Sequence, residues 1–160
     1  MWICRAGKDA CYLSKVLKEN RIFLFWDGFQ GDYSSLKELR EFRDIVQGER
    51  AESSKTSISN WAAQLHAFCI GMQCEDYIMI PHYKARYYTL ARIIGVYEYN
   101  EAEKFRHSRN IEIVKTDIPK NIFDQSQRFS LNAFRTVYKV REEEELLKTI
   151  YENGEEGING

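Results

Sequence analysis

The segment that most constrains the fold is Arg-Ile-Phe-Leu-Phe-Trp-Asp-Gly at residues 21–28. Its first residues are mostly apolar and of high β-propensity, which predicts a strand over residues 21–26. The strand ends abruptly in Trp26, Asp27 and Gly28, so that an aromatic face and a hydrogen-bond acceptor stand together at the rim of the fold. Two interpretations of Trp26 follow: it closes the core above a simple turn, or it forms one wall of a pocket that reads a flat ligand such as a base.

Apolar periodicity divides the chain into a helix-containing first half and a strand-rich second half. We expect strands at residues 1–5, 21–26, 77–80, 87–97, 110–115 and 136–140, helices at 9–20, 36–47, 60–72 and 141–152, and single helical turns at 119–123 and 131–134. Six mostly antiparallel strands, with helices inserted between the second and the third, predict an α+β fold built on a small barrel.

Polar residues predict where these helices begin and end. Asp9 is expected to cap the first helix and Asn20 to end it, and Ser34 or Ser35 is expected to cap the second. Residues 48–59 are polar and without periodicity, which predicts a mobile loop between the second and third helices.

Composition indicates one ordinary domain with no overall attraction to nucleic acid. The chain has 160 residues, of which 44% are hydrophobic and 29% are charged, and this is enough to bury a core. Its net charge is -1 and its pI is near 6.3. Any role in nucleic-acid binding must therefore rest on a local basic patch.

The cysteines give no sign of a metal site or of an oxidising compartment. Cys4, Cys11, Cys69 and Cys74 contain no C-x-x-C pair, so we expect no zinc and no other metal or cofactor. Nothing resembles a signal peptide, and no run of ~20 apolar residues is present to span a bilayer. We expect a soluble, cytoplasmic, thiol-reduced protein that does not contact a membrane.

The sequence contains no recognisable catalytic set. His66, His82 and His107 lie far apart and on different expected elements, and no nucleophile elbow, zinc-protease motif or glycine-rich phosphate loop is present. Glu112 and Lys115 have two residues between them, which is the wrong spacing for the metal-binding Glu-x-Lys of Mrr-like nucleases. We therefore expect a binding domain rather than an enzyme.

A second candidate site is a set of basic residues interleaved with aromatic ones in the strand-rich half. The basic residues are Lys84, Arg86, Arg92, Lys104, Arg106, His107 and Arg109. The aromatic residues are Tyr83, Tyr87, Tyr88, Tyr97, Tyr99 and Phe105. Such a mixture is typical of surfaces that stack on bases and hold phosphates. The alternative is a solvated sheet edge with ordinary strand tyrosines.

Several separated motifs together resemble PUA-like domains of the EVE and YTH group. The nearest likeness is to the version at the N-terminus of modification-dependent restriction systems of the Mrr and McrB type. The matching stretches, in family order over residues 1–140, are WICRAG (2–7), IFLFWDG (22–28), GDYSSL (31–36), WAAQ (61–64) with Phe68, EDYIMIP (75–81), ARIIGVYEY (91–99), HSRNIEI (107–113) and DIP (117–119).

The resemblance implies a small twisted β-barrel flanked by helices at residues 1–140, followed by a helix at 141–152 and a flexible tail or linker at 153–160. Such domains grip one nucleotide, flipped out of DNA or RNA, in an aromatic pocket. The implied base-binding residues are Trp26, Asp27, Gly28, Asp32, Tyr97, Tyr99 and Phe105. The implied contacts to the nucleic-acid backbone are Lys84, Arg86, Lys104, Arg106, His107 and Arg109. Unlike YTH domains, this chain has no tryptophan in the loop at residues 97–109.

The function implied by the resemblance is non-catalytic recognition of a modified base, methylated for example, by the specificity module of a restriction or defence system. DNA is the expected nucleic acid, and a nuclease or motor domain in the same chain or complex is the expected effector. Two alternatives stay open. The domain reads modified RNA, or it is a protein-interaction domain that uses the apolar helix at Trp61.

Overall fold

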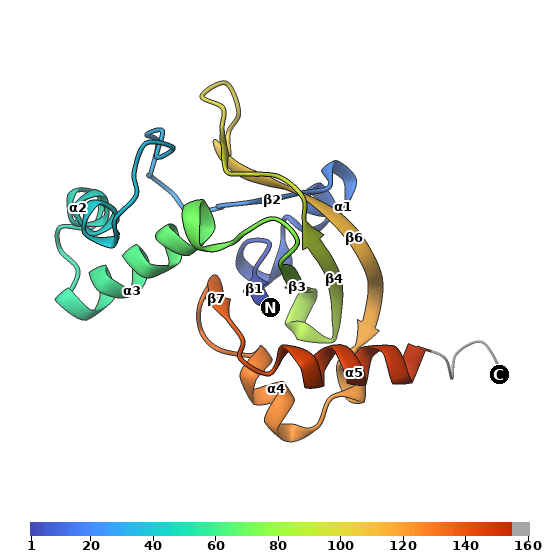
Figure 1. The fold of residues 1–160 in the computed structure, drawn as a ribbon. Coiled ribbons are helices and arrows are strands. Elements are labelled where there is room, and N and C mark those ends of the chain that lie inside the picture. Colours follow the sequence, from blue (N-terminus) through green and yellow to red (C-terminus); the bar gives the residue numbers. More distant parts are fainter. Residues whose placement is uncertain (155–160) are drawn as a thin grey trace.

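The computed structural model describes residues 1–154. It contains one curled mixed sheet with helices on both faces (Figure 1). The α-helices are α1 (Leu13–Glu19), α2 (Leu39–Glu49), α3 (Lys55–His66), α4 (Gln125–Leu131) and α5 (Glu143–Gly154). The strands are β1 (Trp2–Cys4), β2 (Arg21–Phe23), β3 (Tyr77–Pro81), β4 (Tyr87–Ile93), β5 (Glu98–Tyr99), β6 (His107–Pro119) and β7 (Val137–Lys139). Short helical turns are η1 (Lys8–Ala10), η2 (Ala67–Gly71), η3 (Tyr83–Ala85) and η4 (Lys120–Ile122), of which η2 is a π-helix.

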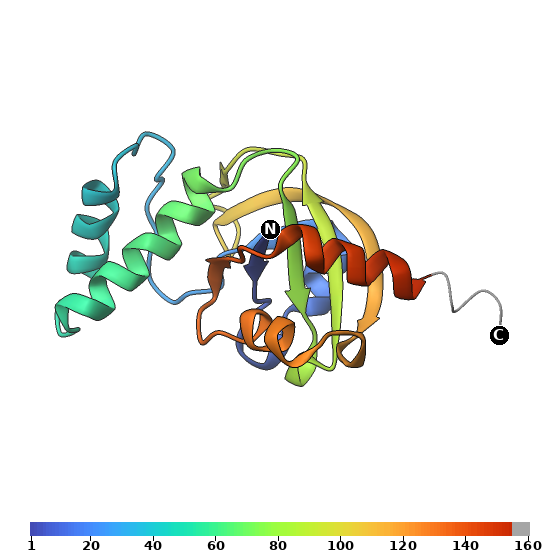
Figure 2. The same cartoon turned by 60° about the horizontal axis from the view of Figure 1, so that its bottom comes forward.

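The sheet has the strand order β2-β6-β4-β3-β1-β7, and β5 pairs with β6. Only β1 and β3 run parallel, and the other described pairs are antiparallel. The long strand β6 bends so that it pairs with β2 and β5 at one end and with β4 at the other, which curls the sheet into a half-barrel (Figures 1 and 2). The predicted α+β class is therefore confirmed, with a half-barrel flanked by helices as its architecture.

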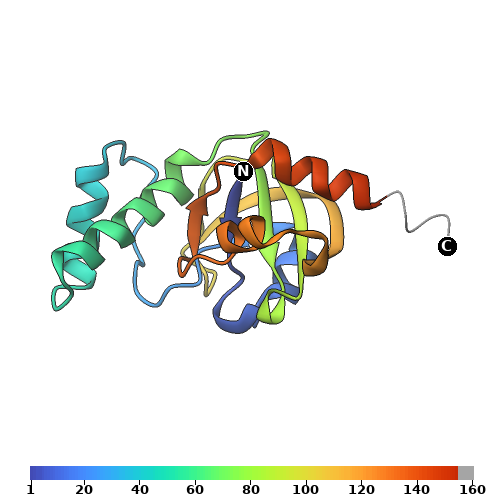
Figure 3. The ribbon, with the colours of Figure 1, turned by 90° about the horizontal axis from the view of Figure 1, so that it is seen from below.

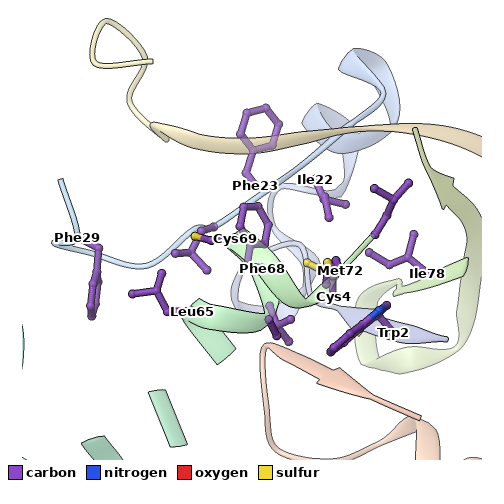
Figure 4. Packing of buried hydrophobic residues seen from close by; sticks show 14 of the residues in the cluster. Trp2, Cys4, Ile22, Phe23, Phe29, Leu65, Phe68, Cys69, Met72 and Ile78 are labelled. Carbon is purple, nitrogen blue, oxygen red and sulfur yellow. The ribbon is translucent and has the colours of Figure 1, made fainter. Parts of the chain in front are cut away.

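The central strands are buried on both faces, which explains their nearly continuous apolar sequences. In β1, Trp2 and Cys4 belong to one core cluster and Ile3 to the other. The first cluster also contains residues of α2, α3 and η2, and Figure 4 shows Phe68 and Met72 beside Cys4. The second cluster contains residues of α4 and α5, which lie in front of the sheet in the view from below (Figure 3).

Strand boundaries differ from the prediction where polar residues or bulges interrupt the pattern. The predicted strand at 87–97 ends at Ile93, because the amides of Ile94 and Gly95 both bond to the carbonyl of Asn110 and break the regular ladder. The predicted strand at 110–115 extends over 13 residues as β6, which pairs with β2 and β5 before it pairs with β4. The predicted strand at 21–26 ends as β2 at Phe23.

The residues that cap the helices agree only partly with the prediction. Asn20 ends α1 in the left-handed conformation (φ 52°), as expected. Asp9 does not cap a helix, since it lies in the turn η1 with φ 53°. A capping box of Glu38 with Glu41 starts α2, so neither Ser34 nor Ser35 is the cap. Ser54 caps α3, and most of the expected mobile loop at residues 48–59 is therefore helical.

The C-terminal part also differs in detail. The predicted turn at 119–123 is confirmed as η4, whereas the turn predicted at 131–134 is wrong, because α4 ends at Leu131. The helix α5 continues through residues 153–154, where a tail was expected, and residues 155–160 of that expected tail lie outside the described residues. No helix in the described part of the chain is long and apolar enough to cross a membrane.

Candidate functional site

Trp26 stands just beyond the end of β2, at the edge of the first core cluster. Its side chain is half-buried, and its indole Nε1 donates a hydrogen bond to Oγ1 of Thr136, 3.3 Å away. Its ring lies 4.6 Å from that of Trp61, with 52° between the two planes. Because these two rings already touch, a flat ligand has no room between them and must stack against their free side.

A cleft of about 350 Å³ opens beside this tryptophan pair. It is lined by the aromatic residues Phe25, Trp26 and Trp61, by the basic residues Arg5, Lys8 and Arg50, and by Gly7, Asp27 and Thr136. The volume is at the lower end of the range of small-molecule sites, which suits a single base better than a larger ligand. Of the predicted base-binding residues, Trp26 and Asp27 line this cleft.

The turn that follows Trp26 is held in place by Arg50. The Nη2 group of Arg50 donates to the carbonyl oxygen of Asp27 at 2.6 Å, and the guanidinium lies 5.0 Å from the ring centres of both Phe29 and Trp61. Gly28 has φ 81° in this turn, and an added Cβ would come within 2.7 Å of Oε2 of Glu49. Glycine adopts this conformation without strain, and its role is to shape the turn.

The cleft continues into a larger groove of about 600 Å³, and Arg5, Gly7, Lys8 and Thr136 line both. Four basic side chains and one acidic side chain border the groove, namely Arg5, Lys8, Lys84, Arg135 and Asp9. The groove is thus locally basic, although the chain as a whole is not. Of the predicted backbone-binding residues, Lys84 belongs to this groove, and Arg86 lies in a separate hollow with Tyr87 and Pro119.

Arg5 and Gln64 shape the loop between α4 and β7 that forms one side of the groove. Arg5 donates from Nε to the carbonyl of Arg135 (3.0 Å) and from Nη2 to that of Ala133 (2.9 Å). The buried side-chain oxygen of Gln64 accepts from the amides of Thr136 (2.9 Å) and Val137 (3.0 Å). This loop therefore holds Thr136, and with it the indole of Trp26, in a defined position.

Tyr97, a predicted base-binding residue, and His107, a predicted backbone contact, form a different, closed cluster. His107 is only 3% exposed and stacks 5.0 Å from the ring of Tyr33. Its Nε2 faces the carbonyl oxygen of Phe29, which can only accept, so Nε2 carries the proton and Nδ1 accepts from the hydroxyl of Tyr97 at 2.6 Å. Burial lowers the pKa of His107, in keeping with this neutral form. The side chain is not available to a phosphate.

Tyr99 and Arg106 fasten the loop after Trp26 to the sheet. The hydroxyl of Tyr99 and Nη1 of Arg106 both donate to the carbonyl oxygen of Gln30, at 2.7 and 3.0 Å. Asp32 in the same loop is exposed and accepts from the amide of Ser34 at 3.0 Å, and this hydrogen bond lowers the pKa of Asp32. These three side chains lie outside the cleft.

Phe105 supports the cleft from behind rather than lining it. Its ring packs edge-on against Phe25 and Tyr12, with both centres 4.7 Å away, and Phe25 lines the cleft. Lys104 is exposed, and its Nζ lies 5.2 Å above the Phe105 ring.

Arg109 is a structural residue, contrary to its prediction as a phosphate contact. It is 3% exposed and donates from Nε and Nη2 to the carbonyl of Gly95, at 3.1 and 3.0 Å. Its Nη1 donates to the carbonyls of Phe68 (3.3 Å) and Met72 at the end of η2. The guanidinium is therefore occupied by backbone carbonyls in the core.

Sequence reasoning missed the residues that complete the cleft and the groove: Arg5, Lys8, Arg50, Trp61, Arg135 and Thr136. Trp61 lies in an apolar helix, where a tryptophan is normally a core residue. The basic residues are isolated in sequence and form no cluster before folding. No group of three or more histidine, cysteine or acidic side chains suited to a metal gathers within residues 1–154.

Comparison with known proteins adds a family but no assigned activity. No curated protein and no solved structure matches the chain at a significant level. One protein-family model, described as a domain of unknown function, matches residues 2–141 and so spans every residue of the cleft and the groove. Because this match covers most of its length, the chain belongs to the family called Domain of unknown function (DUF8426).

Proposed function

We propose that this chain is a non-catalytic nucleic-acid-binding domain that takes a modified base of DNA, flipped out of the helix, into the cleft beside Trp26 and Trp61. The observation that supports the proposal is the continuity of the aromatic cleft with the basic groove, which share four lining residues. A nucleotide needs such a pair of surfaces: an aromatic one for the base and a cationic one for the adjoining phosphates.

The energies of base binding fit a half-exposed tryptophan pair. Extruding a base from a duplex costs a few kcal/mol. Stacking on an aromatic side chain returns about 1–3 kcal/mol per base, and one buried methyl group adds about 0.8 kcal/mol. Trp26 is already oriented by Thr136 and packed on Trp61, so little side-chain freedom is lost on binding.

Asp27 is the residue that would recognise the base through a hydrogen bond. Its carboxylate is an acceptor at the exposed rim of the cleft, and an acceptor suits the exocyclic amino group of adenine or cytosine. A methyl group alone gives modest discrimination, so the polar group is needed to reject other bases. We therefore infer that the modified base presents an exocyclic amino group, as adenine and cytosine do.

The proposal includes a relationship to PUA-like domains of the EVE and YTH group and a role as the specificity module of a restriction or defence system. It is supported by the order of the sequence motifs and by a half-barrel flanked by helices. In such a system a nuclease or motor domain, in the same chain or in a partner, acts after the base has been read.

A binding screen tests the proposal. Duplex and single-stranded DNA and matched RNA, each with one N6-methyladenine, 5-methylcytosine or 5-hydroxymethylcytosine or with no modification, are titrated with the protein at several salt concentrations. We expect one modified DNA to bind best, with an affinity that falls steeply as salt rises. Preference for the RNA set would assign a modified-RNA reader, which uses the same cleft and groove. Equal binding of modified and unmodified strands would overturn the base-reading role.

The structure offers less support for an interaction domain that binds proteins through the helix at Trp61. That side chain is half-buried against Trp26 and Arg50 rather than presented on a free helix face. An interaction domain of this kind would show no steep salt dependence with any of the oligonucleotides.

A further inference from the structure

Phe134 is a fully exposed aromatic side chain at the border of the basic groove. Its relative exposure is 105%, the highest among the exposed large hydrophobic residues in the described part of the chain. It lines the groove together with Arg135, Lys8 and Lys84. An isolated exposed phenylalanine is unremarkable on most surfaces, but here it stands among cations that suit a phosphate backbone.

The loop that presents Phe134 is held by side-chain hydrogen bonds on both sides of it. The amide of Ala133 donates to the hydroxyl of Tyr138 at 3.2 Å, and Arg5 holds the carbonyls of Ala133 and Arg135. The amide of Arg135 also donates to the carbonyl of Ala133 at 2.9 Å, which makes a tight turn around Phe134. The aromatic ring is thus exposed on a backbone that is held in place by hydrogen bonds. Less conformational entropy is therefore lost when the ring is inserted into a partner.

The same loop carries the partner of Trp26. Thr136, whose hydroxyl accepts from the Trp26 indole, is two residues from Phe134, and two residues of extended chain span at most about 7 Å. Successive bases of one DNA strand rise by about 3.4 Å. The backbone positions of Phe134 and Thr136 therefore lie within about two base steps of each other.

We propose that Phe134 is a wedge that enters the base stack of duplex DNA at the hole left by the flipped base. This inference rests on the proposed function. Extrusion of a base leaves an unstacked gap, and an apolar side chain that fills the gap recovers part of the lost stacking and slows the return of the base. Arg135, the next residue, lies beside the groove where the adjoining phosphate would pass.

The test uses a duplex in which the hole already exists. Affinities are compared for an unmodified duplex and for the same duplex with one stable abasic site, so that no modified base is required. We expect the parent protein to bind the abasic duplex roughly tenfold more tightly, because the wedge enters without any extrusion of a base. Phe134→Ala should lose this preference.

Phe129→Ala is the matched control, since Phe129 is an equally apolar side chain, 85% exposed, that lines neither the cleft nor the groove. It should keep the parent's preference. Circular dichroism and thermal unfolding check that both variants fold, as the exposure of the two side chains predicts. The wedge is refuted by equal binding of the two duplexes to the parent, or by a preference that survives in Phe134→Ala.

The two proposals fail in different ways. A parent that prefers the abasic duplex through Phe134, yet binds modified and unmodified bases equally, would retain the wedge and overturn the base-reading cleft. A parent that prefers one modified base but not the abasic duplex would retain the cleft and overturn the wedge. Absence of binding to any DNA would overturn both.

Discussion

The indole Nε1 of Trp26 donates a hydrogen bond to Oγ1 of Thr136, a residue 110 positions away in the chain, across a distance of 3.3 Å. This contact joins the end of the second strand to the loop before β7, and it lies where the aromatic cleft meets the basic groove. Trp26 is thus neither a purely buried core residue nor a free surface residue. It is packed on one side and open to the cleft on the other.

Replacing Trp26 tests whether the cleft holds the base. We expect Trp26→Ala to bind the preferred modified DNA roughly tenfold or more weakly, because one stacking surface is worth about 1–3 kcal/mol. Since the ring is half-buried against Trp61, the free energy of unfolding should also fall, by about 2 kcal/mol. Fluorescence anisotropy and urea unfolding measure the two effects.

Two further variants separate stacking from general damage to the fold. Trp26→Phe retains a ring but loses the hydrogen bond to Thr136, so its binding should lie between those of the parent and Trp26→Ala. Tyr151→Ala removes a half-exposed aromatic residue from α5, away from the cleft, and should bind like the parent. Unchanged binding by Trp26→Ala would remove Trp26 from the site.

Lys84 tests whether the groove follows the phosphate backbone. Lys84→Ala should weaken binding to modified and unmodified DNA by the same factor, because phosphate contacts are independent of sequence. The slope of log affinity against log salt should become shallower by about 0.9 for each lost contact to duplex DNA. Lys18→Ala, an exposed lysine on α1 outside the groove, is the control and should keep the parent's slope. A loss confined to the modified DNA would instead place Lys84 at the base.

Local sequence patterns predicted the α+β class and several element ends, because these depend on neighbouring residues. Asn20 stops a helix through its own left-handed conformation, and Pro81 ends β3 beside a short turn. The curl of the sheet, in contrast, depends on one strand pairing with three others, and no local pattern in residues 107–119 encodes that.

The candidate site was predicted only in part for the same reason. Trp26 and Asp27, two of the predicted base-binding residues, line the cleft, and they directly follow an apolar run. His107 and Arg109 carry charge-bearing groups in a basic segment, yet the fold buries both and turns them toward backbone carbonyls. Trp61 meets Trp26 only after α3 packs against the sheet, so its role could not be read from its apolar helix.

The buried His107 predicts a loss of stability in mild acid. Its folded-state pKa lies below the unfolded value of about 6.5, so its neutral form is favoured by folding. Above pH 7 both states are neutral and nothing is lost. As the pH falls below about 6.5, the unfolded chain takes up the proton first, and the free energy of unfolding decreases until the folded-state pKa is passed.

Urea unfolding of the parent and of His107→Gln between pH 8 and pH 5 checks this sign. The variant should be less stable at pH 8, because it loses the Tyr97 and Phe29 contacts, but its stability should fall less steeply toward pH 5. Some acid dependence should remain, because burial also lowers the pKa of His82. A variant that loses as much stability as the parent over this range would show that His107 does not titrate as proposed.

Arg109 provides the sharpest test between a structural and a nucleic-acid-binding role. Its guanidinium satisfies the carbonyls of Gly95, Phe68 and Met72 from a buried position. Arg109→Lys keeps the charge, but a single compact ammonium group cannot reach both sets of carbonyls as the planar guanidinium does. We expect a loss of unfolding free energy on the order of 3 kcal/mol, since each unsatisfied buried group costs about 1–3 kcal/mol.

The matched control is Arg106→Lys. Arg106 lies in the same segment, but within residues 1–154 its guanidinium reaches only the carbonyl of Gln30 and the hydroxyl of Tyr99, near the surface. Its loss of unfolding free energy should be about 1 kcal/mol. For Arg109→Lys the salt dependence of DNA binding should match the parent's at a temperature where the variant stays folded, because no phosphate contact has been removed. A variant of undiminished stability with a shallower salt slope would instead make Arg109 a phosphate contact, and would require the end of η2 to open when DNA binds.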